Sequence, residues 1–428
     1  MEKVVVTGVG MVTSLGGTPT QTYRALLDGC SGICPISDFD TRGFACRMGA
    51  QVPAIDPREV VINPRDARIM GIQGLMLIKA SRDAFADANL NRYPVNGESM
   101  GLFIGMGMVD YNLDDLLPAV QASLNSDGTI NNEAFFSRGY GEIYPLWPLS
   151  LLSNMALCQV AIRLGIKGEN AVFAAYGDAG AKAIHEGVNT IMEGKAEAVL
   201  AGGVSEIISP LSLARNLSLE LLNIDRSLNC NACIPFNSEG KGTILGEGCG
   251  VMLLESHSSA EKRGARALAE VSGFGSAFER GGEKAWPTTP AVQKAMESSM
   301  INAGVDPACV DLIIAHGEGT AGDNNEKDAI CRCFSVADRT IDVYASKGAL
   351  GNLFAASPVV DAILGIQMME NGVVPPAYPD HSTKNPMPFN LICHESLRKR
   401  PECILINTRS HQGHCGSLVI TACREKRV

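Results

Sequence analysis

The sequence predicts an α/β protein in which helices cover a large buried sheet. Of its 428 residues, 46% are apolar and 19% are charged, so the chain can bury a large core. Short apolar runs alternate with longer helix-like segments, which is typical of parallel or mixed sheets. The second part of the chain repeats the order of these elements in the first part, which indicates a duplicated unit.

The first half is predicted to contain five buried strands separated by helices. Residues 4–8, VVVTG, form the first strand and end in a glycine turn. A long helix over 64–90 has Pro64 in its first turn and carries an apolar stripe. Further strands are predicted at 102–105, 171–175, 198–201 and 250–255, and further helices at 151–164 and 179–193. Residues 108–140 are polar and mixed, which predicts helix and loops at a surface or an interface.

The second half is predicted to begin after residue 257, with a charged helix at 259–264 and a strand at 268–273. A helix at 292–303 and two strands separated by a glycine turn and a helix follow, and a hairpin-like pair of strands ends the half. No flexible linker separates the halves, 1–257 and 258–428, so we expect one rigid body. The remaining predicted elements are strands at 312–315, 343–346, 403–407 and 417–422, and a helix at 358–371.

Charge and composition exclude several classes of function. The net charge of −10 argues against nucleic acid as a partner, because phosphate binding needs a basic face. The first residues run directly into a strand, and no apolar stretch of about 18 residues occurs, so we expect neither a secretory signal nor a membrane span. The 14 cysteines have no framework spacing, which predicts a cytoplasmic protein with reduced thiols.

Two short patterns resemble binding motifs but are incomplete. The glycine turn after residues 4–8 lacks the third glycine of a dinucleotide-binding loop, because Thr13 stands there. Cys230 and Cys233 form a CxxC without a second ligand pair, so no metal site is expected.

The stretch AVFAAYGDAG, residues 171–180, predicts a strand that turns directly into a helix. Such a turn places its central residue at the positive end of the helix, where a fold can activate a nucleophile. Here that residue is Gly177, which has no side chain. The turn therefore has the form of a catalytic elbow without its nucleophile.

Several motifs, in this order and spacing, resemble the β-ketoacyl-ACP synthases, the condensing enzymes of the thiolase fold. The resemblance covers almost the whole chain and implies five layers, α-β-α-β-α, formed by two homologous halves. The motifs are VVVTGVGMVTSLG near the N-terminus, PFN at 235–237, EGCGVMLLE at 247–255, AHGEGTAGD at 315–323, SKGALGN at 346–352 and GVVPP at 372–376.

The resemblance implies where the catalytic groups of the family would lie. In that family a cysteine at the elbow is acylated, and two histidines promote decarboxylation of malonyl-ACP and hold the oxyanion. The cysteine position matches Gly177, the first histidine is kept as His316, and the second position carries Asn352. The supporting lysine and acid match Lys347 and Glu326. None of this implies an intact catalytic set.

Two further regions are interpreted through the same resemblance. Where the family has a glycine- and phenylalanine-rich gate, this chain reads NTRSHQGHCGS, which contains Arg409, His411 and Gly413. Arg65 and Arg68 could receive an acyl carrier protein, although solvated charges at a helix start are an equal alternative. The chain is expected to have no cofactor of its own and to meet the phosphopantetheine arm of the carrier only as a visiting group.

The pattern resembles a chain-length factor, a catalytically inactive ketosynthase paralogue of type II polyketide and polyene synthases. The resemblance implies a heterodimer with an active ketosynthase, with residues 108–140 lining the partner's acyl tunnel. Many aromatic-polyketide factors carry Gln at the elbow, so Gly177 favours another branch, such as aryl or linear polyenes or unusual aromatic products. Two alternatives stay open: a malonyl-ACP decarboxylase that primes a pathway, and a homodimeric scaffold that binds acyl carriers.

Five side chains near these motifs have ordinary structural interpretations as well. His316 could be a core histidine without a role. His411 and His414 are expected to form a polar loop cluster, since no third metal ligand is near. Asp178 is predicted to cap the helix after the elbow, and Cys415 to be a small buried residue, although it could be a relocated thiol.

Overall fold

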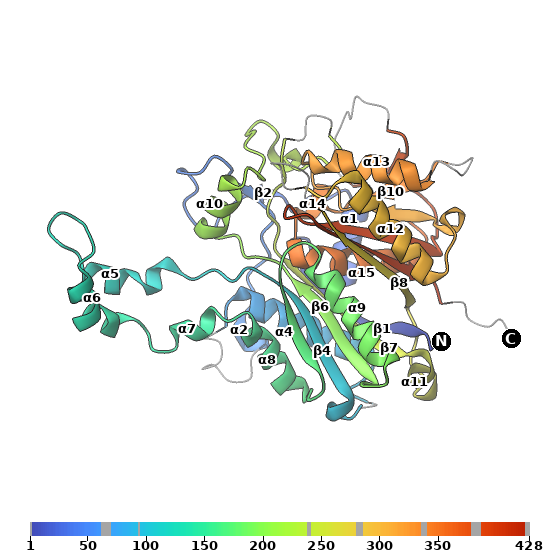
Figure 1. The fold of residues 1–428 in the computed structure, drawn as a ribbon, viewed down its shortest axis with the longest axis horizontal. Helices are drawn as coiled ribbons and strands as arrows, with labels where there is room; N and C mark the ends of the chain where they lie inside the picture. The colour runs from blue at the N-terminus through green and yellow to red at the C-terminus, as the bar shows by residue number, and fades with distance from the viewer. Residues whose placement is uncertain are drawn as a thin grey trace.

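The computed structural model describes residues 2–60, 70–92, 95–237, 241–279, 286–334, 340–377 and 387–423. Ten principal strands and six principal helices build the body, and most of the predicted elements are found within a few residues of their expected bounds (Figure 1). The part of the predicted helix 64–90 that lies at 64–69, with Arg65 and Arg68, is outside the described residues. The strands are β1 (Val4–Thr13), β4 (Met100–Gly107), β5 (Asn170–Ala175), β6 (Ala198–Val204), β7 (Gly248–Ser256), β8 (Ala269–Phe278), β9 (Leu312–Ile314), β10 (Asp342–Tyr344), β12 (Cys403–Arg409) and β13 (His414–Thr421). The helices are α4 (Ile72–Asp87), α8 (Asn154–Leu164), α9 (Ala179–Met192), α12 (Thr289–Ala303), α13 (Gly322–Phe334) and α15 (Ser357–Asn371).

The two halves have the same strand order and the same strand directions. In the first half the order is β5-β4-β6-β7-β1, and in the second it is β10-β9-β12-β13-β8. In each half the first three strands of this order are parallel, and the last two are antiparallel to their neighbours. The two sheets meet where β1 pairs with β8 at Val5–Glu270 and Val6–Ala269. The expected duplication is therefore visible in the topology.

Five layers result from the way the helices cover these sheets. Helices α9 and α15 lie between the two sheets, α4 and α8 cover the outer face of the first, and α12 and α13 cover the outer face of the second (Figure 1). In α15 every residue from Ser357 to Met369 is buried, as expected for a helix enclosed on all sides. This arrangement confirms the predicted layering.

Smaller elements connect these layers. They are α1 (Pro19–Leu27), α2 (Pro57–Val60), α10 (Pro210–Ser218), α11 (His257–Lys262), α14 (Lys347–Leu350), and the short strands β2 (Cys34–Pro35), β3 (Met48–Gly49) and β11 (Asn390–Leu391). Within the described parts of the chain, no helix is both long and apolar enough to cross a membrane.

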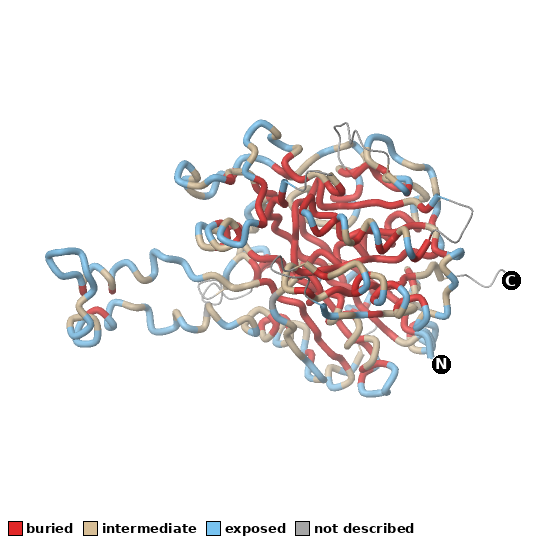
Figure 2. The backbone as a smooth tube through the Cα atoms, turned by 45° about the horizontal axis from the view of Figure 1, so that its top comes forward, coloured by how far each residue is buried: buried red, intermediate tan, exposed pale blue. Residues whose placement is uncertain are grey.

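Residues 111–152 leave the body as a long protrusion, here called the arm (Figures 1 and 2). It contains the helices α5 (Leu117–Gln121), α6 (Asn132–Ser137) and α7 (Trp147–Ser150), and most of its backbone is exposed. Ten of the sixteen exposed large apolar side chains in the described residues belong to it. These are Tyr111, Leu113, Leu117, Leu124, Ile130, Phe136, Tyr140, Tyr144, Leu146 and Leu152.

Candidate functional site

The elbow between β5 and α9 has no room for a side chain. Gly177 is buried in this turn, as the sequence predicts. A Cβ atom at Gly177 would lie 2.4 Å from the backbone carbonyl oxygen of Arg409, which belongs to the paired strand β12. The Thr408 hydroxyl donates a hydrogen bond to the carbonyl of Gly177 and holds the two segments together. A cysteine could occupy this turn only if the β12–β13 hairpin moved.

His316 and Asn352 lie beside the elbow, but both face a carboxylate of the chain itself. His316 Cε1 is 3.6 Å from the position that a Cβ of residue 177 would take. Asn352 Nδ2 donates to Glu318 Oε2 at 2.6 Å, and His316 Nε2 lies 3.3 Å from the same oxygen. Thr320 donates to the other carboxylate oxygen at 3.0 Å. The donors available for a substrate oxyanion are therefore directed at Glu318.

The surroundings of His316 keep its imidazole neutral. Burial lowers its pKa well below the usual value, and the positive charges of Lys347 and Arg409 lower it further, against the opposing effect of Glu326. The backbone N–H of Arg409 donates to Nδ1 at an N–N distance of 3.4 Å. We therefore assign the ring proton to Nε2, which faces Glu318.

Arg409 fills the volume next to the elbow with a buried positive charge. Its guanidinium pairs with Asp323, and its Nε lies 3.3 Å from Glu326 Oε2. Burial alone would lower the pKa of Arg409, but the carboxylates of Asp323, Glu326 and Glu318 raise it overall, so the side chain stays charged. The guanidinium carbon also lies 5.6 Å from the ring centroid of Trp286, a cation–π distance.

Backbone N–H groups stabilise the carboxylates of this cluster by hydrogen bonds. Asp323 accepts hydrogen bonds from the backbone of Phe236, Glu318 and Gly319. Glu326 accepts from the backbone of His316 at 2.8 Å and of Gly317 at 3.1 Å. The two acids fix the glycine turn that follows β9, so Glu326 holds His316 through its backbone.

Lys347 belongs to a second buried pair beneath this turn. Its Nζ lies 3.7 Å from Asp361 Oδ2, and both side chains are almost completely buried. Burial raises the pKa of Asp361, although Lys347 and the Ser346 hydroxyl oppose the rise. Lys347 is thus near enough to affect the pKa of His316, and its ion pair is with Asp361 of α15.

The remaining predicted gate residues form a polar and aromatic loop. The His411 ring meets Tyr176 edge-on at 5.8 Å, and His414 lies 4.6 Å from the ring of Phe278. Gly413 adopts a φ of 102°, which the tight hairpin between β12 and β13 requires. In the described parts of the chain, no group of three or more His, Cys, Asp or Glu side chains could hold a metal ion.

The capping prediction for Asp178 is wrong, and the prediction that Cys415 is a small buried residue is confirmed. Asp178 occupies the N-cap position of α9 but makes no capping hydrogen bond, so that prediction is wrong. Its carboxylate pairs with Lys182 at 2.7 Å instead, one helical turn away. Burial raises the pKa of Cys415 to about 12, which makes it an inert thiol and not a relocated nucleophile.

The space left at the elbow is about 10 Å³, barely enough for one water molecule. The elbow is therefore nearly closed. The described residues around it are Tyr176, Gly177, Leu221, Trp286, Glu318, Asn352, Phe354, Arg409, Ser410 and His411.

Sequence reasoning missed Glu318 and Asp323, which organise the cluster. A usable signal was present, because Glu318 stands between two glycines directly after a buried strand. An ionisable residue at such a position needs a buried partner. Arg409 was singled out only as a gate residue, and its ion pairs depend on contacts across more than 80 residues.

Comparisons with known proteins agree with this architecture. The family description "Beta-ketoacyl synthase, N-terminal domain" matches residues 1–260, and "Beta-ketoacyl synthase, C-terminal domain" matches residues 268–379. The 3-oxoacyl-(acyl-carrier-protein) synthase 2 of Vibrio cholerae is 29% identical over 425 residues, 97% of this chain and 98% of that protein. The enzyme of the same name from Staphylococcus aureus strain COL is 28% identical over 381 residues, 88% of this chain and 87% of its own.

Solved structures share the fold over nearly the full length. The ishigamide ketosynthase/chain length factor has a TM-score of 0.84 and 25% identity, covering 99% of this chain and 100% of its own. A beta-ketoacyl synthase from Burkholderia phymatum has a TM-score of 0.85 and 23% identity with the same coverage. The chain therefore has the thiolase fold.

Proposed function

The chain belongs to the beta-ketoacyl synthase family, and we propose that it is a non-catalytic member that acts as a chain-length factor beside an active ketosynthase. The observation that carries the proposal is the closed elbow. Gly177 supplies no nucleophile, and the backbone of Arg409 occupies the space that the Cβ of a cysteine would need. Without a thiolate at this position no acyl-enzyme can form.

The position of Glu318 argues against the decarboxylase alternative. Such an enzyme would use His316 and Asn352 to stabilise the enolate of malonyl-ACP. Both donors instead face the Glu318 carboxylate, and Asn352 reaches it at 2.6 Å. A substrate that develops negative charge here would be repelled by this carboxylate and would find no volume.

The arm supports the pairing with a second subunit. A segment of about 40 residues that exposes ten large apolar side chains is unfavourable in water unless a partner covers it. The ketosynthase/chain length factor structure, at 25% identity, is a relative in which these two roles occur together. In the proposed complex, residues 111–152 (the arm) help shape the acyl pocket. The acyl carrier protein brings its phosphopantetheine group to the ketosynthase. This chain then needs no cofactor of its own.

Co-expression with a ketosynthase from the same gene cluster tests the proposal. We expect a one-to-one complex by size-exclusion chromatography, and products that vanish or change length by mass spectrometry when this chain is omitted. The isolated chain given malonyl-ACP should release no acetyl-ACP. An unchanged product from the ketosynthase alone would contradict the proposal and leave the carrier-binding homodimer.

A pair of matched variants shows whether the arm makes the contact. Phe136 on α6 is 77% exposed, and Ile301 on α12 is 76% exposed. Helix α12 lies on the side of the body opposite the arm (Figure 1). Phe136→Asp should weaken the complex, and Ile301→Asp should leave it intact. Equal effects of both would place the interface elsewhere.

A further inference from the structure

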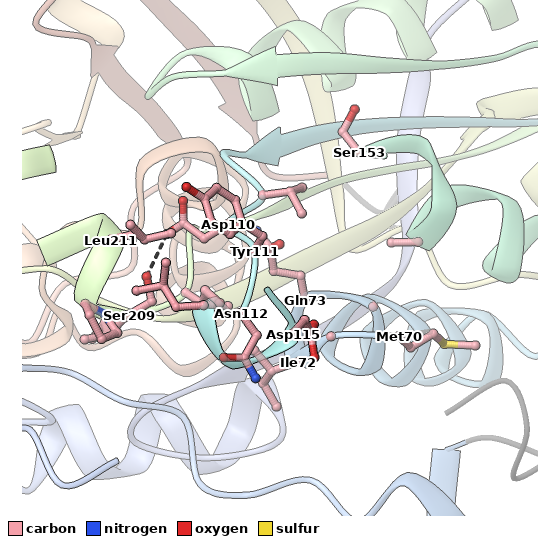
Figure 3. A pocket seen from close by; sticks show the side chains of 18 of the residues that line it. Met70, Ile72, Gln73, Asp110, Tyr111, Asn112, Asp115, Ser153, Ser209 and Leu211 are labelled. Atoms are coloured by element: carbon pink, nitrogen blue, oxygen red, sulfur yellow. Dashed lines mark hydrogen bonds between the residues drawn. The ribbon is translucent and has the colours of Figure 1, made fainter. Parts of the chain in front are cut away.

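A large cavity lies where the arm joins the body, separate from the closed elbow. Its volume is about 620 Å³, and it is formed by the end of β4, the starts of α4, α8 and α10, and the first residues of the arm (Figure 3). Its walls are mainly apolar, with side chains from each of these elements. They include Ile72, Met106, Val109, Met155, Ile208 and Leu211.

Among the described residues that line this cavity, every charged side chain is acidic. Four aspartates line it, and among its described lining residues there is no Lys, Arg or His. Asp110 is paired within the chain, because Arg215 Nη1 lies 2.8 Å from it and the Ser209 hydroxyl donates to it at 2.7 Å (Figure 3). The same guanidinium also pairs with Glu206 at 2.8 Å. Asp38, Asp114 and Asp115 are exposed and form no ion pair with any described residue.

We propose that this cavity receives an apolar side chain of the partner ketosynthase that is flanked by lysine or arginine. The inference rests on the proposed function and names the chemistry of the partner surface. Covering three carboxylates without a counter-charge would be costly, so whatever closes the cavity must bring positive charge. The apolar walls require that the same segment also bring apolar surface.

The same charges exclude the phosphopantetheine arm as the occupant. Its phosphate would meet three carboxylates that have no ion pair with any described residue, and no described basic side chain lines the cavity. The position of the cavity agrees with a protein partner, because residues 111–115 line it and also begin the arm. A subunit that contacts the exposed apolar side chains of the arm would therefore also cover the opening of the cavity.

Charge reversal at the rim tests this complementarity in the full complex. Asp114→Lys with Asp115→Lys should weaken binding of the ketosynthase about tenfold or more at low salt, and the difference should shrink at high salt. Glu261→Lys with Glu297→Lys makes the same change of charge on exposed helix positions of α11 and α12, away from the arm, and should have little effect. Equal effects of both pairs, or a salt-independent loss, would overturn the proposal.

A photo-cross-linking residue at position 152, where Leu152 lines the cavity, identifies the occupant directly. Mass spectrometry should find a ketosynthase peptide in which an apolar residue adjoins lysine or arginine. A cross-link to the carrier protein, to a second copy of this chain, or to an acidic peptide would overturn the proposal. If the unmodified chain fails to bind the ketosynthase at all, the proposed function itself is wrong. If the ketosynthase binds but the cross-link forms with one of these other partners, only the proposed role of the cavity is refuted.

Discussion

Restoring a side chain at the elbow should destabilise the protein without restoring catalysis. An alanine at Gly177 would place its Cβ 2.4 Å from the carbonyl oxygen of Arg409, about 1 Å closer than ordinary van der Waals contact. The contacted atom is backbone in β12, where Arg409 pairs with Cys415 of β13, so it cannot turn away as a flexible side chain could. Overpacking of this kind costs about 1–3 kcal/mol.

The assay is thermal unfolding of Gly177→Ala, Gly177→Cys and a control glycine variant. The unfolding entropy of about 2.1 cal/mol/K per residue gives about 0.9 kcal/mol/K for 428 residues, so 1 kcal/mol corresponds to about 1 °C and we expect the midpoint to fall by about 1–3 °C. Gly43 has no heavy atom within 4 Å of a Cβ built on it, so Gly43→Ala should change the midpoint little.

Gly177→Cys should also fail to take up an acyl group from acyl-ACP, because the site encloses only about 10 Å³. A Gly177→Ala variant as stable as the parent would refute the steric argument. A Gly177→Cys variant that forms a thioester would refute the closed site.

Three further predictions concern buried groups around the elbow. Arg409→Met leaves the carboxylates of Asp323, Glu326 and Glu318 without their counter-charge and should cost about 3–5 kcal/mol of unfolding free energy; a variant within 1 kcal/mol of the parent in denaturant titration would be contrary to this. Because the pKa of His316 is lower in the folded than in the unfolded chain, only the unfolded chain takes up its proton below about pH 6.5, and stability should fall on acidification by up to about 1.4 kcal/mol per pH unit from this group. His316→Asn should remove that part of the slope, and equal slopes in both proteins would disprove the assignment. Cys415 should resist iodoacetamide at pH 8 in the native protein while exposed Cys30 and Cys309 react, as peptide mass spectrometry can show; early labelling of Cys415 would contradict its burial.

Local sequence patterns predicted the α/β class and the duplication because the strands are short apolar runs between helices, and the family resemblance implied the five layers. Helix α9 is found where the pattern placed it, and the first strand begins at Val4 as predicted. The predicted glycine turn after residue 8 is wrong, because β1 continues through Gly8 and Gly10 to Thr13 and pairs with β7 there. The closure of the elbow could not be predicted in this way. It depends on the distance between Gly177 and Arg409, which only the pairing of β12 with β13 and the packing of both halves determine.

The arm shows a second limit of the same kind. Residues 108–140 were expected at a surface or an interface because they are polar and mixed. Composition does not show that this segment leaves the body, or that its apolar side chains remain exposed there (Figure 2). The rim of the cavity shows the same limit. Asp38 and Asp114 lie far apart in the sequence, and only the fold brings both of them to this cavity.

The proposed lack of catalytic activity does not depend only on the missing cysteine sulfur at position 177. In the turn after β9, four backbone N–H groups donate to the carboxylates of Glu326 and Asp323; they belong to His316, Gly317, Glu318 and Gly319. The donors of this turn are therefore already occupied by negatively charged groups. Arg409 balances those acids, and its backbone in turn closes the elbow over Gly177. A cysteine at the elbow would therefore need the hairpin to move, which would separate Arg409 from its acids. Glu318 would still occupy the donors of His316 and Asn352. Because these contacts depend on one another, restoring the family's residue at any single position should not restore catalysis. Substitutions that change the product are expected at the arm and at the cavity beside it.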